Sequence, residues 1–385
     1  MHIATIDKGR SHLREVVVDG EAASWLTVID YEMRVGSAAV KLGCCAHVET
    51  RRKFRQRGYM RKLMEDTVAY MRERGHVLSI ITGIADFYGK FGYASCFPDR
   101  SLSVSVRDAE AAARETKPRA ACRTRKLRRG DGRALLRTYN AAADGRFGAL
   151  VREAAWFERA GRCGQDVFVA TAGGGRAVGY ASCGRQGDRL HVSEVAATTP
   201  DALPALLKRL AAEGVRRRVE RMEIDALGDE PVAELCRRFG CRWTTTFHRN
   251  ASTMMRVLDQ DAVLRAMCGD FSRRLRGCPA AGRGGTLTIR TELGATTLKV
   301  ARGRVTVAKR PGRRGGVRMT QPQLAQLLAG YRSVADVLAE RRGRAGRRTR
   351  RLLEALFPPR PARLWAAHRY EELHLNPDDY PVPEA

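Results

Sequence analysis

The pattern of apolar and polar residues is most regular between residues 15 and 93. Glu15–Val18 and Ser24–Asp30 are predicted strands on either side of an Asp19-Gly20 turn, and Ala38–Val48 is a third. About fourteen mostly polar residues precede them. We therefore expect a short polar start followed by a series of hairpins.

A helix is predicted after the third strand, between Gly58 and Gly75. Its apolar residues recur in steps of three and four, which places them in one stripe facing a core. They are Met60, Leu63, Met64, Val68 and Met71. Gly75 is expected to end the helix because glycine tolerates positive φ. The apolar run Val77–Ile81 then predicts a buried strand.

The same order of elements recurs between residues 121 and 256. The predicted strands are Arg123–Leu127, Asp166–Thr171, Ala177–Arg185, Arg189–Ala197 and Arg221–Ala226. The predicted helices are Gly132–Ala142, Ala149–Ala160, Pro200–Gly214 and Pro231–Phe239. The strand Ser101–Val106 is expected to close the first unit, and polar residues 107–120 to form a linker.

Residues 259–370 have a different pattern. Leu287–Arg290, Thr296–Ala301 and Arg304–Ala308 alternate and are joined by glycine-rich turns, which predicts an antiparallel sheet. Short helices are predicted at Pro322–Leu328, Val334–Arg341 and Arg347–Leu356. The arginines between 341 and 351 are interpreted as the solvated face of the last helices.

The turn before the first helix is the candidate binding site. It contains Arg55, Gln56, Arg57 and Gly58, and residues 51–53 add three more cations. The first amides of a helix have no partner inside it and lie at the positive end of its dipole, and glycine lets a ligand approach the backbone. The turn therefore predicts a phosphate or pyrophosphate cradle, with an ordinary solvated turn as the alternative.

A second motif, Phe87-Tyr88-Gly89-Lys90-Phe91-Gly92-Tyr93, lies one strand further along. With Arg55-Gln56-Arg57-Gly58-Tyr59-Met60 it resembles the GCN5-related N-acetyltransferases (GNAT), whose pyrophosphate loop reads Arg/Gln-x-x-Gly-x-Gly/Ala. Met60 departs from the last small residue of that pattern. The repeat carries Leu235–Cys241 instead, with Cys236 in the place of Tyr88 and no Arg-x-x-Gly turn, so we expect it to bind no cofactor.

The order of the three units resembles GNAT enzymes of the enhanced-intracellular-survival type. The resemblance implies an α/β (α+β) fold class, with tandem mixed-sheet GNAT domains and a C-terminal domain like sterol carrier protein 2. The implied domains are 1–110, 121–256 and 257–370, with a tail at 371–385. Residues 326–333 and Leu356-Phe357-Pro358 with Trp365 fit the third domain. Because the fold normally opens with an extra strand and two helices, the first domain is expected to be shortened at its N-terminus.

The resemblance implies transfer of an acetyl group from acetyl-CoA, the cosubstrate, to a primary amine by direct attack in a ternary complex. The residues implied to bind the cofactor are Val48, Glu49, Thr50, Arg55, Gln56, Arg57, Gly58, Tyr59, Met60, Arg61, Gly83 and Ile84. A backbone amide near Val48 is the expected oxyanion donor.

Tyr88 is the expected general acid, because a phenol stays protonated at neutral pH and can return a proton to a leaving thiolate. The alternative is a core aromatic residue packed beside its neighbours. The general base stays open. In the relatives it is the C-terminal carboxylate, here that of Ala385, which lies fifteen residues beyond the matching motif at Tyr370; Glu49 and His47 are the alternatives.

Charge adds two competing hypotheses. A net charge of +28 favours polyanionic partners and keeps a nucleic-acid-associated protein open, although no zinc-finger spacing or RNA-binding aromatic motif supports it. The second hypothesis is a protein that binds CoA without transferring an acyl group. It is kept open because the two helices expected to be missing usually form the wall of the acceptor site.

The ten cysteines contain no Cys-x-x-Cys pair, so we expect reduced thiols and no metal site. No apolar run of about eighteen residues and no apolar leader is present, so no membrane span is expected and the cytoplasm is the expected compartment. The expected partner is a small-molecule or peptide amine, and the resemblance implies a homo-oligomer.

Overall fold

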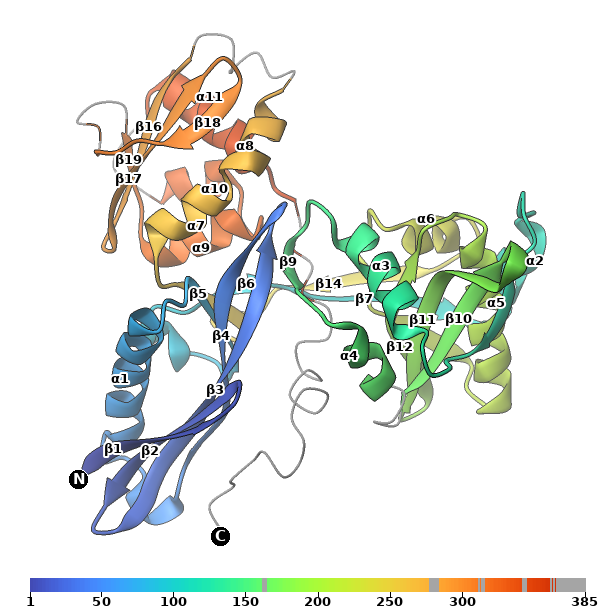
Figure 1. Cartoon of the computed structure of the whole chain (residues 1–385), viewed down its shortest axis with the longest axis horizontal. Coiled ribbons are helices and arrows are strands. Elements are labelled where there is room, and N and C mark those ends of the chain that lie inside the picture. The colour runs from blue at the N-terminus through green and yellow to red at the C-terminus, as the bar shows by residue number, and fades with distance from the viewer. Residues whose placement is uncertain are drawn as a thin grey trace.

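The computed structural model describes residues 1–385 apart from 161–164, 277–283, 311, 313–315, 341–344, 361, 363 and 365–385. Two units, each built on a mixed sheet, lie side by side, and a smaller α+β domain packs on the first of them (Figure 1). Within the described residues the three sheets have eight, seven and four strands.

The first unit begins with a run of antiparallel strands and then adds a helix and a parallel strand. Its elements are β1 (His2–Lys8), β2 (Ser11–Val18), β3 (Glu21–Val35), β4 (Ala38–Thr50), η1 (Arg52–Phe54), α1 (Tyr59–Glu73), β5 (Leu78–Gly83), η2 (Tyr88–Phe91) and β6 (Ala94–Phe97). Asp19 and Gly20 both have positive φ and form the predicted hairpin turn between β2 and β3.

The second unit repeats this plan and inserts two helices near its start. Its elements are β7 (Asp99–Ser105), α2 (Val106–Glu115), β8 (Arg123–Lys126), α3 (Gly132–Ala143), β9 (Phe147–Leu150), α4 (Ala154–Ala160), β10 (Asp166–Ala172), η3 (Gly173–Gly175), β11 (Arg176–Gln186), β12 (Arg189–Ala197), α5 (Ala202–Arg216), β13 (Arg221–Ile224), α6 (Pro231–Arg237), β14 (Arg242–Thr246) and β15 (Ser252–Val257).

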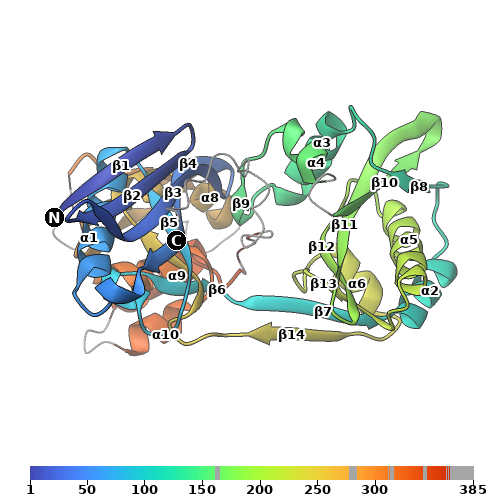
Figure 2. The same ribbon diagram turned by 90° about the horizontal axis from the view of Figure 1, so that it is seen from below.

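The strands are not divided between the sheets in chain order. The first sheet runs β1-β2-β3-β4-β5-β15-β6, with β9 paired with β3 as its eighth strand, and the second runs β14-β7-β13-β12-β11-β10-β8. β7 directly follows the first unit in sequence but pairs with β13 and β14, whereas β15 pairs with β5 and β6. Figure 2 shows β7 and β14 running alongside each other in the second unit's sheet.

The prediction that the strand Ser101–Val106 closes the first unit is therefore wrong. The strand exists, but its alternating apolar residues Leu102 and Val104 are buried in the core of the second unit. Alternation predicts that a strand buries one face, but it does not say against which sheet.

The N-terminal residues also form more strand than the sequence predicted. Residues 1–14 were expected to be a short polar segment, but they form β1 and the start of β2, paired from His2↔Val17 to Lys8↔Ser11. β1 is an edge strand with mostly exposed side chains, so it lacks the apolar alternation that would have identified it. A two-residue turn joins β1 and β2, whereas α3 and α4 separate β8 from β10 in the second unit.

Two further predictions need correction. Ala149–Ala160 was expected to be one helix, but Phe147–Leu150 forms β9, which pairs with the end of β3, and only α4 is helical. In the C-terminal domain, the predicted antiparallel sheet is mixed, since β19 pairs in parallel with β16.

The C-terminal domain has the other predicted strands and helices, and also α7, α8 and β19, which were not predicted. Its elements are α7 (Gln260–Ala266), α8 (Cys268–Leu275), β16 (Gly285–Thr291), β17 (Gly294–Ala301), β18 (Arg304–Val307), β19 (Gly316–Arg318), α9 (Gln321–Leu328), α10 (Val334–Ala339) and α11 (Arg347–Leu356). Its core is continuous with that of the first unit, through Ile29 and Met33 of β3 and Phe271 of α8. α9 also packs against β6 and β15. Trp365 and the tail 371–385 lie outside the described residues.

Candidate functional site

The candidate site begins where β4 and β5 separate. The two strands pair in parallel from Leu42↔Leu78 to Cys45↔Ile81, and no pairing joins their remaining residues. β4 carries a bulge at this point, because residues 47 and 48 lie opposite the single residue Leu26 of β3, and His47 has a φ of 50°. The two strands therefore diverge and leave backbone groups available between them.

The turn after β4 leads to α1 in an open, positively charged conformation. Gln56 and Gly58 have φ values of 64° and 78°, and Gly58 is the N-cap of α1. Among the described residues, no acceptor is bonded to the backbone amides of 56–61, and the first turn of α1 has no acidic residue. The amides of this turn are therefore available to a ligand, as an anion site requires.

The helix behind this turn has the predicted amphipathic face. Leu63, Met64, Val68 and Met71 are buried against the sheet, while Met60 is only partly buried. Arg55, Arg57 and Arg61 are exposed around the turn. The apolar stripe thus fixes the helix on the sheet and directs its N-terminus toward solvent, beside the separating strands.

Tyr88 lies near the end of β5, in the same hydrophobic cluster as the buried face of α1. Its ring packs flat against Gly83, where an added Cβ would overlap the ring, and contacts Phe87 edge to face at 5.0 Å between centroids. The residue is only 6% exposed, but its hydroxyl has no hydrogen-bond partner among the described residues and is not sealed from solvent. Burial, followed by the nearby Cys45, raises the pKa of Tyr88 to about 12.

The buried hydroxyl of Tyr93 lies beneath Tyr88. No pattern in the sequence had indicated a polar contact there. The Tyr93 hydroxyl bonds to Ser79 Oγ at 2.7 Å and lies 3.5 Å from Cys45 Sγ, and Ser79 Oγ donates to the carbonyl of Gly43 at 2.9 Å. Burial raises the pKa of Tyr93 well above 10, so this phenol is a structural donor. The network joins β4 and β5 just before they separate.

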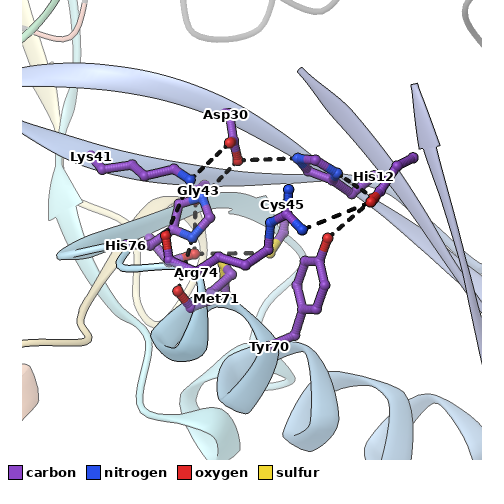
Figure 3. A network of polar contacts seen from close by, with 11 residues as sticks. His12, Asp30, Lys41, Gly43, Cys45, Tyr70, Met71, Arg74 and His76 are labelled. Carbon is purple, nitrogen blue, oxygen red and sulfur yellow. Dashed lines mark hydrogen bonds and ion pairs between the residues drawn. The ribbon is translucent and has the colours of Figure 1, made fainter. Parts of the chain in front are cut away.

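The far end of α1 is held by a second polar network (Figure 3). Asp30 Oδ1 and the carbonyl oxygen of Met71 lie 2.7 and 2.9 Å from the ring nitrogens of His76, and Lys41 lies 3.0 Å from Asp30 Oδ2. The buried His12 contacts Asp7 at 2.6 Å through Nδ1. These contacts attach the end of α1 to β1, β2, β3 and β4.

Two parts of the chain match the same type of domain. Residues 4–96 and residues 148–257 each match a family described as "Acetyltransferase (GNAT) domain". The chain carries two GNAT domains and is an acyltransferase. No curated protein matches it in sequence.

Solved structures share the architecture of this tandem GNAT acyltransferase over most of its length. A probable N-acyltransferase from Enterococcus faecalis V583 has 15% identity and a TM-score of 0.69, with 92% of this chain and 87% of that chain covered. A GCN5-related N-acetyltransferase from Kribbella flavida has 19% identity and a TM-score of 0.69, with 91% and 85% covered. Eis1 from Mycobacterium abscessus has 16% identity and a TM-score of 0.62, with 90% and 87% covered. At these identities the similarity is one of fold.

The second GNAT domain lacks the open cradle of the first. Asp201 is the N-cap of α5 and accepts hydrogen bonds from the amides of Arg119 and Ala120 at 2.9 and 3.1 Å. A carboxylate and the linker thus occupy the place that Gly58 leaves open in the first domain. An anion would meet like charge there.

The strands of the second GNAT domain also separate over a filled core. Pairing of β12 with β13 ends at Val192↔Ile224, and two residues later Glu194 accepts both hydrogen bonds from Arg152 at 2.9 Å. Arg152 stacks on Tyr139 and Trp156 at 3.9 and 3.8 Å. The second domain therefore has a buried ion pair beside its separating strands. In the first domain, Tyr88 and unpaired backbone groups lie at this place.

The predicted base candidates of the tandem GNAT acyltransferase lie at the end of β4. His47 and Glu49 are exposed on the segment that diverges from β5, and partial desolvation lowers the pKa of His47. Val48 and Thr50 alternate with them and are half-buried; Gly83 is half-buried and Ile84 is 70% exposed at the end of β5. Ala385 lies outside the described residues.

Three further predictions concern the cysteines, metal ligands and membrane-spanning helices in the described part of the chain. Eight cysteines are free thiols, five of them buried. No group of three or more metal-ligating side chains gathers among these residues. In the same part of the chain, every helix is too short or too polar to span a bilayer.

Proposed function

We propose that the chain is an acetyl-CoA-dependent N-acetyltransferase that acetylates a primary amine by direct attack in a ternary complex. The observation that carries this proposal is the set of unbonded amides at residues 56–61, placed beside two diverging strands and the Tyr88 hydroxyl. GNAT-type acyl transfer is what the two matched domains imply in general. The acetyl donor and the amine acceptor are the finer steps proposed here.

The first GNAT domain would hold the cofactor through backbone and positive charge. The amides of Gln56 to Arg61 suit the pyrophosphate, with Arg55, Arg57 and Arg61 around it. Val48, Glu49 and Thr50 on one strand, and Gly83 and Ile84 on the other, offer backbone groups to the pantetheine arm. Bound acetyl-CoA supplies an activated acetyl group as a thioester.

Tyr88 would assist the departure of the thiolate. Since its pKa is about 12, the phenol stays protonated throughout the physiological range. A thiol, with a pKa of about 8.5, is a stronger acid, so the phenol acts by donating a hydrogen bond to the developing thiolate. Gly83 allows the ring to lie against the end of β5, because a side chain at this position would overlap the ring.

The amine must lose a proton before or during attack. His47 suits this step because its lowered pKa keeps the imidazole neutral at pH 7. Glu49, two residues along β4, is the second candidate, and the Ala385 carboxylate remains a prediction from the resemblance. Activity that depends on His47 should rise through a pKa below 6.5, whereas substitution by glutamine should abolish that step in the pH profile.

Replacing Tyr88 tests the proposal most directly. In Tyr88→Phe, we expect kcat for acetylation of an amine panel to fall about 100-fold, with a smaller change in KM, because the hydroxyl acts on the leaving group. Release of free thiol measures the rate. Tyr331→Phe, which removes a hydroxyl from the C-terminal domain, should leave both constants unchanged.

Three outcomes would count against the proposal. An unchanged kcat in Tyr88→Phe would remove the phenol from the reaction. Saturable CoA binding by calorimetry without acetylation of any amine would favour a non-catalytic CoA-binding protein. Binding of DNA or RNA that weakens steeply with salt would instead favour the nucleic-acid alternative.

A sterol-carrier-protein-2-like C-terminal domain and a homo-oligomeric assembly are proposed from the resemblance. The cytoplasmic location is proposed from the sequence pattern alone. Size-exclusion chromatography with light scattering measures the oligomeric state directly.

A further inference from the structure

A cavity of about 390 Å³ lies at the junction of the first GNAT domain and the C-terminal domain. Its walls come from the outer side of α1, the end of the η2 turn, β15, the turn between β16 and β17, and the start of α9. This volume is within the usual range for small-molecule sites, about 300–1,000 Å³.

Three cations line this cavity, and none has a carboxylate partner among the described residues. They are Arg72 of α1, Lys90 of η2 and Arg256 of β15. Arg152, by contrast, pairs with Glu194. Cations that line one cavity repel one another, and an anion bound among them would offset that repulsion.

Arg256 is the most constrained of the three. One terminal nitrogen, Nη1, donates to the carbonyl of Phe91, and Nε is buried without a partner. The other, Nη2, has no partner among the described residues and is not sealed from solvent. Burial chiefly lowers the pKa of Arg256. Tyr93 and Glu292 oppose this effect, and repulsion from Arg72 adds to it. An oxyanion at Nη2 would offset both the burial and the repulsion from Arg72.

Two carboxylates also line the cavity, but among the described residues neither forms an ion pair with these cations, and Glu292 acts on Arg256 only at longer range. Both oxygens of Glu292 accept the backbone amide of Gln321, at 3.0 and 2.9 Å, and so cap α9. Glu65 is exposed on α1 and forms no ion pair within the described residues. In the adjoining cavity, Asp259 caps α7 and Asp261 pairs with Arg265. The cations therefore outnumber the carboxylates of the lining by three to two.

Apart from Gln321 and Gly92, the rest of the lining is apolar. Val68 and Phe91 are buried and Leu293 is half-buried, and all three contribute to the wall. An apolar wall with convergent cations suits an anion that carries a compact apolar group.

We propose that this cavity binds a small organic oxyanion, a carboxylate or phosphate on a compact apolar group, with Arg256 as its anchor and Arg72 and Lys90 as supporting cations. The site is distinct from the phosphate cradle at Gly58. It lies along α1 beside residues 65–72, whereas the cradle opens at the N-terminus of that helix.

Calorimetry with benzoate and phenyl phosphate on the full chain tests the site, in the presence of saturating CoA to fill the cradle. We expect one binding event per chain. The double variant Arg72→Met/Lys90→Met should weaken it at least tenfold. Both side chains are exposed and unpaired, so this variant should fold, whereas Arg256 also supports the Phe91 carbonyl.

Lys299→Met/Arg304→Met is the matched control, since it removes the same charge from exposed positions of the C-terminal sheet. It should change the affinity less than twofold. No heat of binding from either probe at millimolar concentration, or an equal loss in the control, would overturn the proposal. Complete displacement of both probes by CoA would also overturn it, because the cavity would then belong to the cofactor site.

Discussion

Tyr88 and Cys236 occupy corresponding positions in the two GNAT domains. They differ in how far their side chains are buried. Each precedes a glycine with positive φ, Gly92 or Gly240, that ends its turn. The Tyr88 hydroxyl keeps contact with solvent, whereas Cys236 is fully buried and burial raises the pKa of its thiol to about 12. A sealed, protonated thiol packs as a small apolar side chain. The sequence comparison had predicted this contrast.

His12 adds a pH-dependent contribution to the stability of the first domain. The Asp30 carboxylate first, and Asp7 next, raise the pKa of His12, against the opposing effects of burial and Arg74. A raised folded-state pKa means that the stabilisation is complete below the unfolded-state pKa of about 6.5. It is lost as the pH rises through the folded-state pKa. We therefore expect the free energy of unfolding to fall above about pH 6.5.

Urea denaturation at a series of pH values measures this effect, and His12→Gln should remove the part of the slope that His12 provides. Asp30 contributes in the opposite direction: burial alone would raise its pKa, but hydrogen bonds from His12, His76 and Lys41 lower it, so its contribution disappears in acid. His2→Gln, on the exposed edge strand, is the control. An identical slope in His12→Gln and the unmodified chain would show that His12 does not titrate in this way.

At the scale of elements, α1 and α5 differ in whether the amides at their N-termini are accessible to an anion. Each spans fifteen residues and buries an apolar stripe on its sheet. The difference lies in one N-cap residue: Gly58 with its amides exposed, or Asp201 with its carboxylate bonded to the linker. A helix N-terminus attracts anions only where its amides are accessible.

Gly58→Asp should give α1 the character of α5. Aspartate tolerates positive φ better than most residues, and no atom lies within 4 Å of an added Cβ, so the fold should persist. The carboxylate would repel the pyrophosphate and weaken CoA binding at least about tenfold, or 1.4 kcal/mol. Gly58→Asn has the same shape without the charge and should bind CoA more tightly than Gly58→Asp in calorimetry. Equal affinities for the two variants would mean that the pyrophosphate does not bind at this turn.

At the scale of the whole molecule, the exchanged strands make the two GNAT domains one folding unit. β15 fills the place between β5 and β6, and its residues Met254, Met255 and Val257 are fully buried in the first unit. β7 does the same for the second sheet. Removing either strand would expose unpaired edges and an apolar core.

Separating the chain between Lys117 and Pro118 should therefore leave two incomplete sheets. We expect residues 1–117 alone to lack a cooperative thermal transition, and co-expression with 118–385 to give a one-to-one complex that unfolds cooperatively. Circular dichroism and size-exclusion chromatography measure both properties. A cooperatively folded 1–117 fragment would show that the first sheet does not need β15.

Much of the fold was accessible to sequence reasoning because most strands and helices have strong periodicity. The amphipathic stripe of α1, its end at Gly75 and the Asp19-Gly20 turn are local features, and the structure confirms each. β1 was missed because an exposed edge strand has no apolar face. The exchange of β7 and β15 was missed because pairing partners distant in sequence leave no local pattern.

The sequence by itself determined most of the elements and the basic turn that is the candidate for holding a phosphate, since backbone preferences and charge at Arg55–Gly58 are properties of nearby residues. Tertiary structure decided everything that depends on distant neighbours. It set the burial that raises the pKa of Tyr88 to about 12, and it brought the three cations together from α1, η2 and β15. Contacts of this kind form only when the chain folds, because their members are separated by tens to hundreds of residues.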